Sequence, residues 1–224
     1  MIGIYDYTVW LTYGSAASAV IGILIALSGH GHPYGSALCL LISGLFDAFD
    51  GHVARLKKNR TESERNYGIQ IDSLSDLVAF GVLPVCIGVS LRRRALFSAA
   101  VFRIPFFLLL AVSVLYVLAA LIRLAYFNVT EIERQQAETG CREFYTGLPV
   151  TSASLIFPTL LLIQHFVSVD LSLLYYLLLL VTAMAFVLRF RLRKPRLKAI
   201  IIMVGIGFAE FMVILIARFF FRHA

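Results

Sequence analysis

Residues 46–76 read FDAFDGHVARLKKNRTESERNYGIQIDSLSD and contain four of the six aspartates of this 224-residue chain. Asp47 and Asp50 are three positions apart, and Asp72 and Asp76 are four positions apart. Both spacings place the two members of a pair on the same face of a helix. The polar residues between the pairs are numerous enough to turn the chain back. We therefore expect a helical hairpin in which the four carboxylates converge.

The rest of the chain is strongly apolar. Hydrophobic residues make up 60% of it and charged residues 15%, whereas soluble domains have roughly 45–50% and about 25%. This composition argues against a soluble globular protein and against intrinsic disorder, which requires low hydrophobicity. A bilayer-spanning helix needs about 20 mainly apolar residues. On that basis we expect an all-α, polytopic integral membrane helix bundle that forms a single domain over residues 1–224. The chain has about seven predicted spans, at 8–28, 34–56, 69–90, 101–127, 148–167, 171–190 and 198–221.

The basic residues predict the orientation in the membrane. Lys and Arg number 20 against 13 Asp and Glu, a net charge of +7. With a cytoplasmic N-terminus, thirteen basic residues fall in inside loops and six at outside ends, as is usual for membrane proteins; the run Arg92–Arg94 opposes this assignment. We expect a multi-pass protein of the cell (cytoplasmic) membrane with its aspartates facing the cytoplasm. Anionic membrane lipids are the expected partners of the basic loops, and no nucleic acid is expected.

Converging carboxylates in a membrane need a compensating charge. One aspartate at the centre of a span costs roughly 2.5–3.5 kcal/mol, and neighbouring carboxylates repel one another. Divalent cations remove both penalties, and oxygen ligands favour Mg²⁺, Mn²⁺ or Ca²⁺ over zinc. Two such ions would clamp a phosphoryl group during its displacement. A divalent-cation transporter is the alternative from another functional class, although the acidic cluster has no second copy in the chain.

The residues beside the aspartates suit a bound ligand. Gly51 and Gly68 each cost about 1 kcal/mol in a helix relative to alanine, which is understandable where a ligand approaches the backbone closely. Ala54 is small enough for close helix contact. Arg55 is placed to pair with a phosphate or a carboxylate.

These positions resemble the signature of the CDP-alcohol phosphotransferase family. That signature is Asp, two residues, Asp-Gly, two residues, Ala-Arg, a spacer, Gly, three residues, Asp, three residues, Asp. It occurs here as Asp47, Asp50, Gly51, Ala54, Arg55, Gly68, Asp72 and Asp76. The spacer, 56–67, is longer than the family's usual one by about one helical turn.

The resemblance implies a six-helix membrane core, here followed by a C-terminal span, and a homodimer. It also implies two divalent cations, Mg²⁺ or Mn²⁺, held by the four aspartates, with Asp76 as the catalytic base. A loop hydroxyl, from Thr61 or Ser63, would contact the substrate. The positions that match CDP-diacylglycerol binding in the family are Gly51, Ala54, Arg55, Thr61 and Gly68.

Three stretches resemble the phosphatidylserine synthase branch of that family. They are IDSLSDLVAFGVLP at 71–84, IRLAYFNV at 122–129 and FYTGLPV at 144–150, although Tyr126 stands where the branch usually has an arginine. The branch implies transfer of a phosphatidyl group from CDP-diacylglycerol to the hydroxyl of L-serine, with release of CMP. Another acceptor within the family stays open: glycerol phosphate, inositol, inositol phosphate or choline.

Arg123 and Asn128 end the fourth predicted span on the same side of the membrane as the aspartates. Arg123 follows an apolar run, where a charge is costly unless it has a role. It either contacts an anion, such as the serine carboxylate or a lipid phosphate, or extends to the interface. The branch motif favours the first interpretation and makes Arg123 and Asn128 the candidate acceptor-binding residues. Glu210, in the last predicted span, marks either a helix–helix contact or a broken helix.

Overall fold

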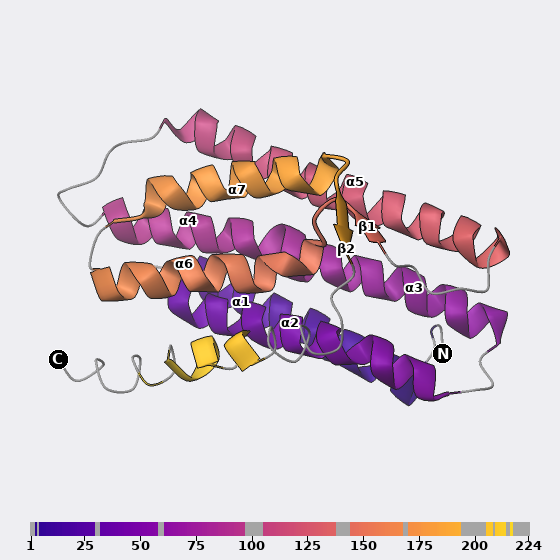
Figure 1. Ribbon diagram of the computed structural model, residues 1–224. Helices are drawn as coiled ribbons and strands as arrows, with labels where there is room; N and C mark the ends of the chain where they lie inside the picture. Colours follow the sequence, from indigo (N-terminus) through magenta and orange to yellow (C-terminus); the bar gives the residue numbers. More distant parts are fainter. Residues whose placement is uncertain are drawn as a thin grey trace.

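The computed structural model describes residues 3, 5–29, 32–57, 61–96, 105–137, 144–167, 170–193, 205–207, 209–213 and 216, and most of them are helical (Figure 1). The α-helices are α1 (Trp10–Leu27), α2 (Pro33–Leu56), α3 (Glu62–Asp76), α4 (Leu83–Leu96), α5 (Phe106–Ala137), α6 (Ala153–Val167) and α7 (Ser172–Val187). The shorter elements are 3-10 turns at Tyr7–Val9 and Val150–Ser152, a π-helical turn at Leu77–Val82, and strands β1 (Phe144–Thr146) and β2 (Arg191–Arg193).

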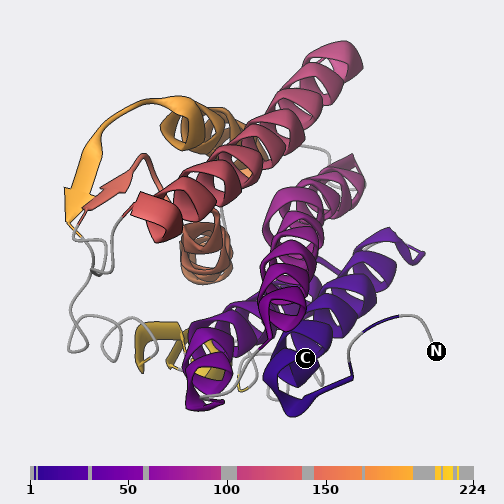
Figure 2. The same cartoon turned by 90° about the vertical axis from the view of Figure 1, so that its right-hand side faces the viewer.

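The helix formed by α3, the π-helical turn and α4 runs through the middle of the bundle. Helices α5 and α7 lie on one side of it and α1 and α2 on the other, with α6 between α7 and α2 (Figures 1 and 2). The start of α1, the end of α2, the start of α3 and the end of α5 lie together at one end of the bundle (Figure 1). The arrangement therefore gathers the aspartate hairpin and the end of α5 at the same end of the molecule.

Within the described residues, five helices are long and apolar enough to cross a membrane. They are Tyr7–Leu27, Pro33–Ala54, Glu62–Arg93, Phe106–Thr130 and Val150–Val167. The prediction of a multi-pass α-helical membrane bundle is confirmed, and its first five spans correspond to these helices. The sixth predicted span contains the shorter apolar helix α7. The seventh lies largely outside the described residues, so the total of seven stays a prediction.

Two features differ from the sequence-based expectation. Helix α5 continues to Ala137, well beyond the predicted end at residue 127. The chain also forms a two-stranded antiparallel ribbon, β1 with β2, which no sequence pattern predicted. Gly147 makes the ribbon possible: its φ is 77°, a conformation that favours glycine, and its N–H donates to the Phe190 carbonyl at 2.7 Å.

The π-helical turn comes directly after Asp76 and is followed by Pro84 within α4. Pro84 has no N–H to donate to the carbonyl four residues earlier, that of Phe80. The Tyr116 hydroxyl on α5 donates to the Phe80 carbonyl instead, at 2.8 Å. The Tyr175 hydroxyl on α7 donates to the Pro84 carbonyl at 2.7 Å. Two tyrosines thus fasten α5 and α7 to the irregular part of the central helix.

Large aromatic side chains fill the space around that irregular part. Phe80, Tyr116, Phe157 and Tyr175 are fully buried. The rings of Tyr116 and Phe157 have centroids 5.8 Å apart, and those of Phe157 and Tyr175 are 5.1 Å apart, within the range typical of aromatic pairs. Aromatic side chains therefore fill much of the core between the π-helical turn, α5, α6 and α7.

Small and hydroxyl-bearing residues join α1 to α2. Ser15 donates to the Ser43 carbonyl at 3.3 Å, and Ser43 donates back to the Ser15 carbonyl at 3.0 Å. Ser18 donates to the Cys39 carbonyl at 2.9 Å. A Cβ at Gly22 would lie 2.8 Å from the Cys39 Cβ, so any larger residue there would push the two helices apart.

The position of Arg93, one residue of the basic run Arg92–Arg94, has a structural explanation. An Nη atom of Arg93, at the end of α4, donates to the Leu27 carbonyl at the end of α1, at 3.0 Å. A cation at a helix C-terminus satisfies an unbonded carbonyl and interacts favourably with the helix dipole. Arg93 is therefore accounted for by helix capping, whichever way the protein is oriented.

Candidate active site

Two adjacent helices bring three aspartates together. Helix α2 carries Asp47 and Asp50, and α3 carries Asp72. Each of the three offers a carboxylate oxygen, and these oxygens all lie within 4.8 Å of one another. Oxygen ligands lie about 2.0–2.6 Å from Mg²⁺ or Ca²⁺, so two ligands of one ion are at most about 4–5 Å apart. The spacing of the three carboxylates therefore fits a shared divalent cation.

Asp76 lies one helical turn further along α3 and is the most deeply buried of the four. It is 8% exposed, and the other three aspartates are half-buried. Its carboxyl group interacts electrostatically with Asp47, Asp72 and Asp50, and it is within hydrogen-bonding reach of Asp47. Asp76 is not one of the three closest ligands, but it belongs to the same cluster.

Helix α1 supplies a third wall of the cluster. The Thr12 hydroxyl donates to Oδ2 of Asp50 at 3.3 Å, and the Ser75 hydroxyl donates to the Thr12 carbonyl at 3.1 Å. Thr12 was not predicted to belong to the site, because a threonine within an apolar span is an ordinary residue. Its polar side chain in the first span, at the same end as the aspartates, was the only available signal.

The other signature residues lie on the same two helices. Gly51 and Ala54 follow Asp50 on α2, Gly68 precedes Asp72 on α3, and all three are half-buried. Arg55 belongs to α2, but its side chain lies outside the described part of the structure. These positions stay predictions as donor-binding residues.

Thr61 has a structural role at the start of α3. Its side chain accepts a hydrogen bond from the Glu64 N–H at 3.2 Å, and the Glu64 side chain accepts one from the Thr61 N–H at 2.9 Å. This reciprocal pair is a capping box, which satisfies two backbone donors at a helix start. Lys57 Nζ lies 2.8 Å from both Glu64 and Asp6. Lys57 therefore connects the end of α2 and the start of α3 to the N-terminal segment.

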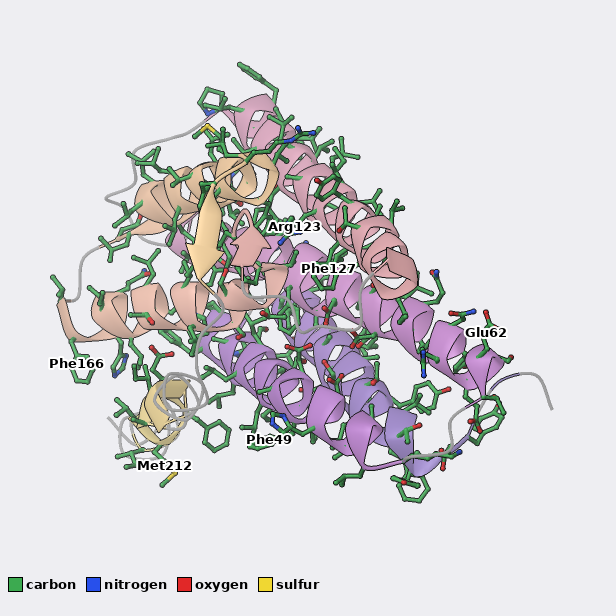
Figure 3. The ribbon with its side chains drawn as sticks, turned by 45° about the vertical axis from the view of Figure 1, so that its right-hand side comes forward. Phe49, Glu62, Arg123, Phe127, Phe166 and Met212 are labelled. Carbon is green, nitrogen blue, oxygen red and sulfur yellow. The ribbon has the colours of Figure 1, made fainter. Side chains whose placement is uncertain are left out.

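Arg123 points into the protein. It is 6% exposed, its Nε donates to the Leu148 carbonyl at 3.2 Å, and its guanidinium lies 5.7 Å from the centre of the Phe127 ring. Figure 3 shows Arg123 and Phe127 between α5 and the central helix, far from Glu62 at the start of α3. A residue that extends to the interface would be exposed at its charged end, so the burial of Arg123 argues against that interpretation. Its contact with an anion stays a prediction.

Asn128 is connected to the aspartate helix. The Ser73 hydroxyl on α3 donates to Oδ1 of Asn128 on α5 at 3.0 Å. Ser73 is the residue after Asp72, so this bond fixes the part of α5 around Asn128 against α3. The fold therefore brings both candidate acceptor-binding residues to the side of α5 that faces the central helix.

Glu210 lies on the C-terminal helical segment and is buried against α6. It is 7% exposed, and the Thr159 hydroxyl donates to one of its oxygens. Of the two interpretations of Glu210, the structure supports a helix–helix contact.

Comparison with known proteins identifies the group to which this arrangement belongs. The family model for CDP-alcohol phosphatidyltransferases matches residues 8–187. The chain is 34% identical over 148 residues to the CDP-diacylglycerol–serine O-phosphatidyltransferase of Saccharomyces cerevisiae, covering 65% of this chain and 48% of the relative. It is 34% identical over 141 residues to the archaetidylserine synthase of Methanothermobacter thermautotrophicus, covering 62% and 51%.

A bacterial relative gives a similar result. The chain is 29% identical over 137 residues to the CDP-diacylglycerol–serine O-phosphatidyltransferase of Bacillus subtilis, covering 61% of this chain and 66% of the relative. The chain spans about half the length of the yeast and archaeal relatives that it matches. No solved structure matches it.

Proposed function

The chain belongs to the CDP-alcohol phosphatidyltransferase family, and on that premise we propose that it transfers a phosphatidyl group from CDP-diacylglycerol to the hydroxyl of L-serine. The products are phosphatidylserine and CMP. The observation that carries the proposal is the approach of the Asp47, Asp50 and Asp72 carboxylates to within 4.8 Å of one another, at the signature positions. The printed names of the relatives support serine as the acceptor.

Asp47, Asp50, Asp72 and Asp76 would hold two divalent cations, Mg²⁺ or Mn²⁺. Carboxylate oxygens are the ligands that these ions prefer. Helices α2 and α3 carry the two halves of the signature and bring three of these carboxylates within 4.8 Å of one another. When bound, the ions neutralise the diphosphate and stabilise the charge that develops during phosphoryl transfer. Gly51, Ala54, Arg55, Thr61 and Gly68 would bind CDP-diacylglycerol beside them.

Asp76 would act as the base. It accepts the proton of the serine hydroxyl while the serine oxygen forms a bond to the phosphorus that carries the diacylglycerol. The bond from that phosphorus to the bridging oxygen breaks, and the electron pair leaves with CMP.

Arg123 and Asn128 would orient the acceptor. Serine brings a carboxylate that needs a cation and an ammonium that needs an oxygen acceptor or an aromatic face. Arg123 supplies the charge, and Ser73 fixes the Asn128 side chain through a bond of 3.0 Å.

The setting of the reaction belongs to the same proposal. We place the protein in the cell membrane with its active site facing the cytoplasm, as a single domain over residues 1–224 and a homodimer. The basic loops would contact anionic lipids. Mass measurement in nanodiscs checks the dimer, and an active monomer would contradict it.

The direct test is release of CMP by the purified protein from CDP-diacylglycerol, with Mg²⁺ or Mn²⁺ and one acceptor at a time. We expect L-serine to support release and to appear in the lipid product. Glycerol phosphate, inositol, inositol phosphate and choline serve as competing acceptors, and an ether-lipid donor tests the chemistry named for the archaeal relative. Release with another acceptor alone would keep the family reaction and overturn the serine assignment.

A further inference from the structure

Three hydroxyl residues on α1 form one line of contacts with α2. Ser18, Ser15 and Thr12 are spaced by three positions, which places them on neighbouring parts of one helix face. Ser18 and Ser15 donate to backbone carbonyls of α2, those of Cys39 and Ser43. Thr12 differs from them because its hydroxyl donates to a carboxylate, Oδ2 of Asp50, at 3.3 Å.

Thr12 is also bonded to the second aspartate helix. Its carbonyl accepts the Ser75 hydroxyl of α3 at 3.1 Å, and Ser75 directly precedes Asp76. A carbonyl has two lone pairs and can take this bond in addition to one within its own helix. Thr12 is 5% exposed and Ser75 is 4% exposed. One buried residue of α1 therefore contacts both helices that carry the carboxylate cluster.

From these contacts we propose that Thr12 is a positioning residue for the metal-binding carboxylates. Its hydroxyl fixes the orientation of the Asp50 carboxylate, and its carbonyl fixes α3, and with it Asp72 and Asp76, relative to α2. Residues that hydrogen-bond a metal ligand are commonly worth a factor of about 10–100 in metal affinity. The inference rests on the proposed function, because it assumes that the aspartates bind a divalent cation.

The chain offers a matched set of variants that separates positioning from packing. Thr12→Val keeps the volume and removes the hydroxyl, and Thr12→Ser restores the hydroxyl in a smaller side chain. Ser15→Ala removes the neighbouring contact on the same face without touching an aspartate. If Thr12 contributes only packing, Thr12→Val should bind Mn²⁺ as tightly as the wild type does. If the loss of any hydroxyl contact between α1 and α2 weakens binding, Ser15→Ala should weaken it as much as Thr12→Val.

The experiment is titration of the purified protein in nanodiscs with Mn²⁺, measuring free Mn²⁺ by electron paramagnetic resonance. We expect Thr12→Val to weaken Mn²⁺ binding about tenfold, with Thr12→Ser and Ser15→Ala close to the wild type. In CMP release, Thr12→Val should need correspondingly more Mn²⁺ for half-maximal rate and should recover most of its rate at saturating Mn²⁺.

The outcomes distinguish this inference from the proposed function. Wild-type protein that binds no Mn²⁺ would overturn the metal site itself. If the wild type binds Mn²⁺ and Thr12→Val binds it with the same affinity, only the role of Thr12 is overturned. A loss of Mn²⁺ affinity in Ser15→Ala equal to that in Thr12→Val would overturn that role as well. If Thr12→Val does not fold, Ser75→Ala tests the contact to α3 in the same titration, where weaker Mn²⁺ binding is expected and unchanged binding overturns the inference.

Discussion

The two sides of the central helix are held together in different ways. On the side of α1 and α2, hydroxyl groups bond across the helices, as Ser15 and Ser43 do reciprocally. On the side of α5, α6 and α7, large rings fill the interior, with Tyr116, Phe157 and Tyr175 fully buried. The first side carries Asp47 and Asp50, and the central helix carries Asp72 and Asp76. The second side carries none of the four.

This difference follows from what each side has to do. Lipid tails are as apolar as the side chains they surround, so helices in a membrane associate through close packing and hydrogen bonds. Small residues and directional bonds fix the register between two helices, which a set of converging carboxylates requires. Aromatic side chains supply buried contact area, which stabilises the bundle with less demand on register.

The π-helical turn lies where the two sides meet. A π-helical turn carries an extra residue in the helix and is frequent at functional sites. Here it separates the carboxylates of α3 from Pro84 and the aromatic core, so the faces of α3 and α4 are oriented independently. The irregular helix therefore serves the carboxylate side and the aromatic side at once.

The largest expected effect comes from the carboxylate side. Asp47→Asn, Asp50→Asn, Asp72→Asn and Asp76→Asn should each lower the rate of CMP release at least about a hundredfold, because the four groups act as a unit. Asp170→Asn is the matched control, since Asp170 accepts the Ser172 N–H at the start of α7 and lies outside the cluster. Turnover close to that of the wild type in any two of the four variants would contradict a shared two-metal site.

The next effect tests the boundary between the two sides, where Arg123 on α5 faces the central helix. Arg123→Ala should raise the KM for serine at least about thirtyfold, because losing one partner of a buried charge pair costs about 2 kcal/mol or more. The KM for CDP-diacylglycerol should hardly change. Arg93→Ala, which also removes a bond to a backbone carbonyl, should leave both constants unchanged. Loss of donor binding with an unaltered serine dependence would assign Arg123 to the donor site.

A smaller effect is expected on the aromatic side. Tyr116→Phe removes the hydroxyl that donates to the Phe80 carbonyl and should lower the free energy of unfolding by about 1 kcal/mol. The measurement is thermal unfolding in detergent, with CMP release as a check that the reaction persists. Tyr176→Phe is the control, because Tyr176 is 5% exposed and no hydrogen bond of its hydroxyl occurs within the described residues. Equal decreases in Tm in both variants would mean that the hydrogen bond from Tyr116 to the Phe80 carbonyl adds no stability of its own.

The smallest expected effect concerns the ion pairs of Lys57 with Asp6 and Glu64, which belong to neither of the two sides compared above. The hydrogen bond from Lys57 lowers the pKa of Asp6, and the hydrogen bonds to Asp6 and Glu64 raise the pKa of Lys57. The stabilisation that comes with a lowered carboxyl pKa is present above about pH 4 and is lost as the pH falls through the lowered value. The stabilisation that comes with a raised amine pKa is present below about pH 10.4 and is lost as the pH rises through the raised value. Lys57→Met should therefore lower Tm slightly at neutral pH.

Two conditions should remove that difference. It should shrink as the pH falls through the lowered Asp6 pKa and as KCl screens the exposed charges. A difference that persists in 1 M KCl would indicate lost packing of the lysine stem instead of a lost ion pair.

Much of this could be predicted from the sequence, because the relevant signals are local. Apolar runs and their lengths predicted the membrane helices, since each span must satisfy its own backbone in lipid. The spacing of Asp47, Asp50, Asp72 and Asp76 predicted two helix faces, and the glycines and Ala-Arg between them connected these faces to one family. The residue types predicted a divalent cation because only oxygen ligands were available.

Other features depended on which helices become neighbours, and no local pattern contains that information. Thr12 could not be connected to Asp50 before α1 was placed against α2, and Asn128 could not be connected to Ser73 before α5 was placed against α3. The π-helical turn and the β1–β2 ribbon arise where tertiary contacts supply hydrogen bonds that the local chain lacks, from Tyr116 in one case and between distant strands in the other. The residue types and their spacing along the chain thus predicted which side chains would carry the chemistry. The contacts that hold those side chains became evident only from the packed fold, because hydrogen bonds between helices form only after the helices pack.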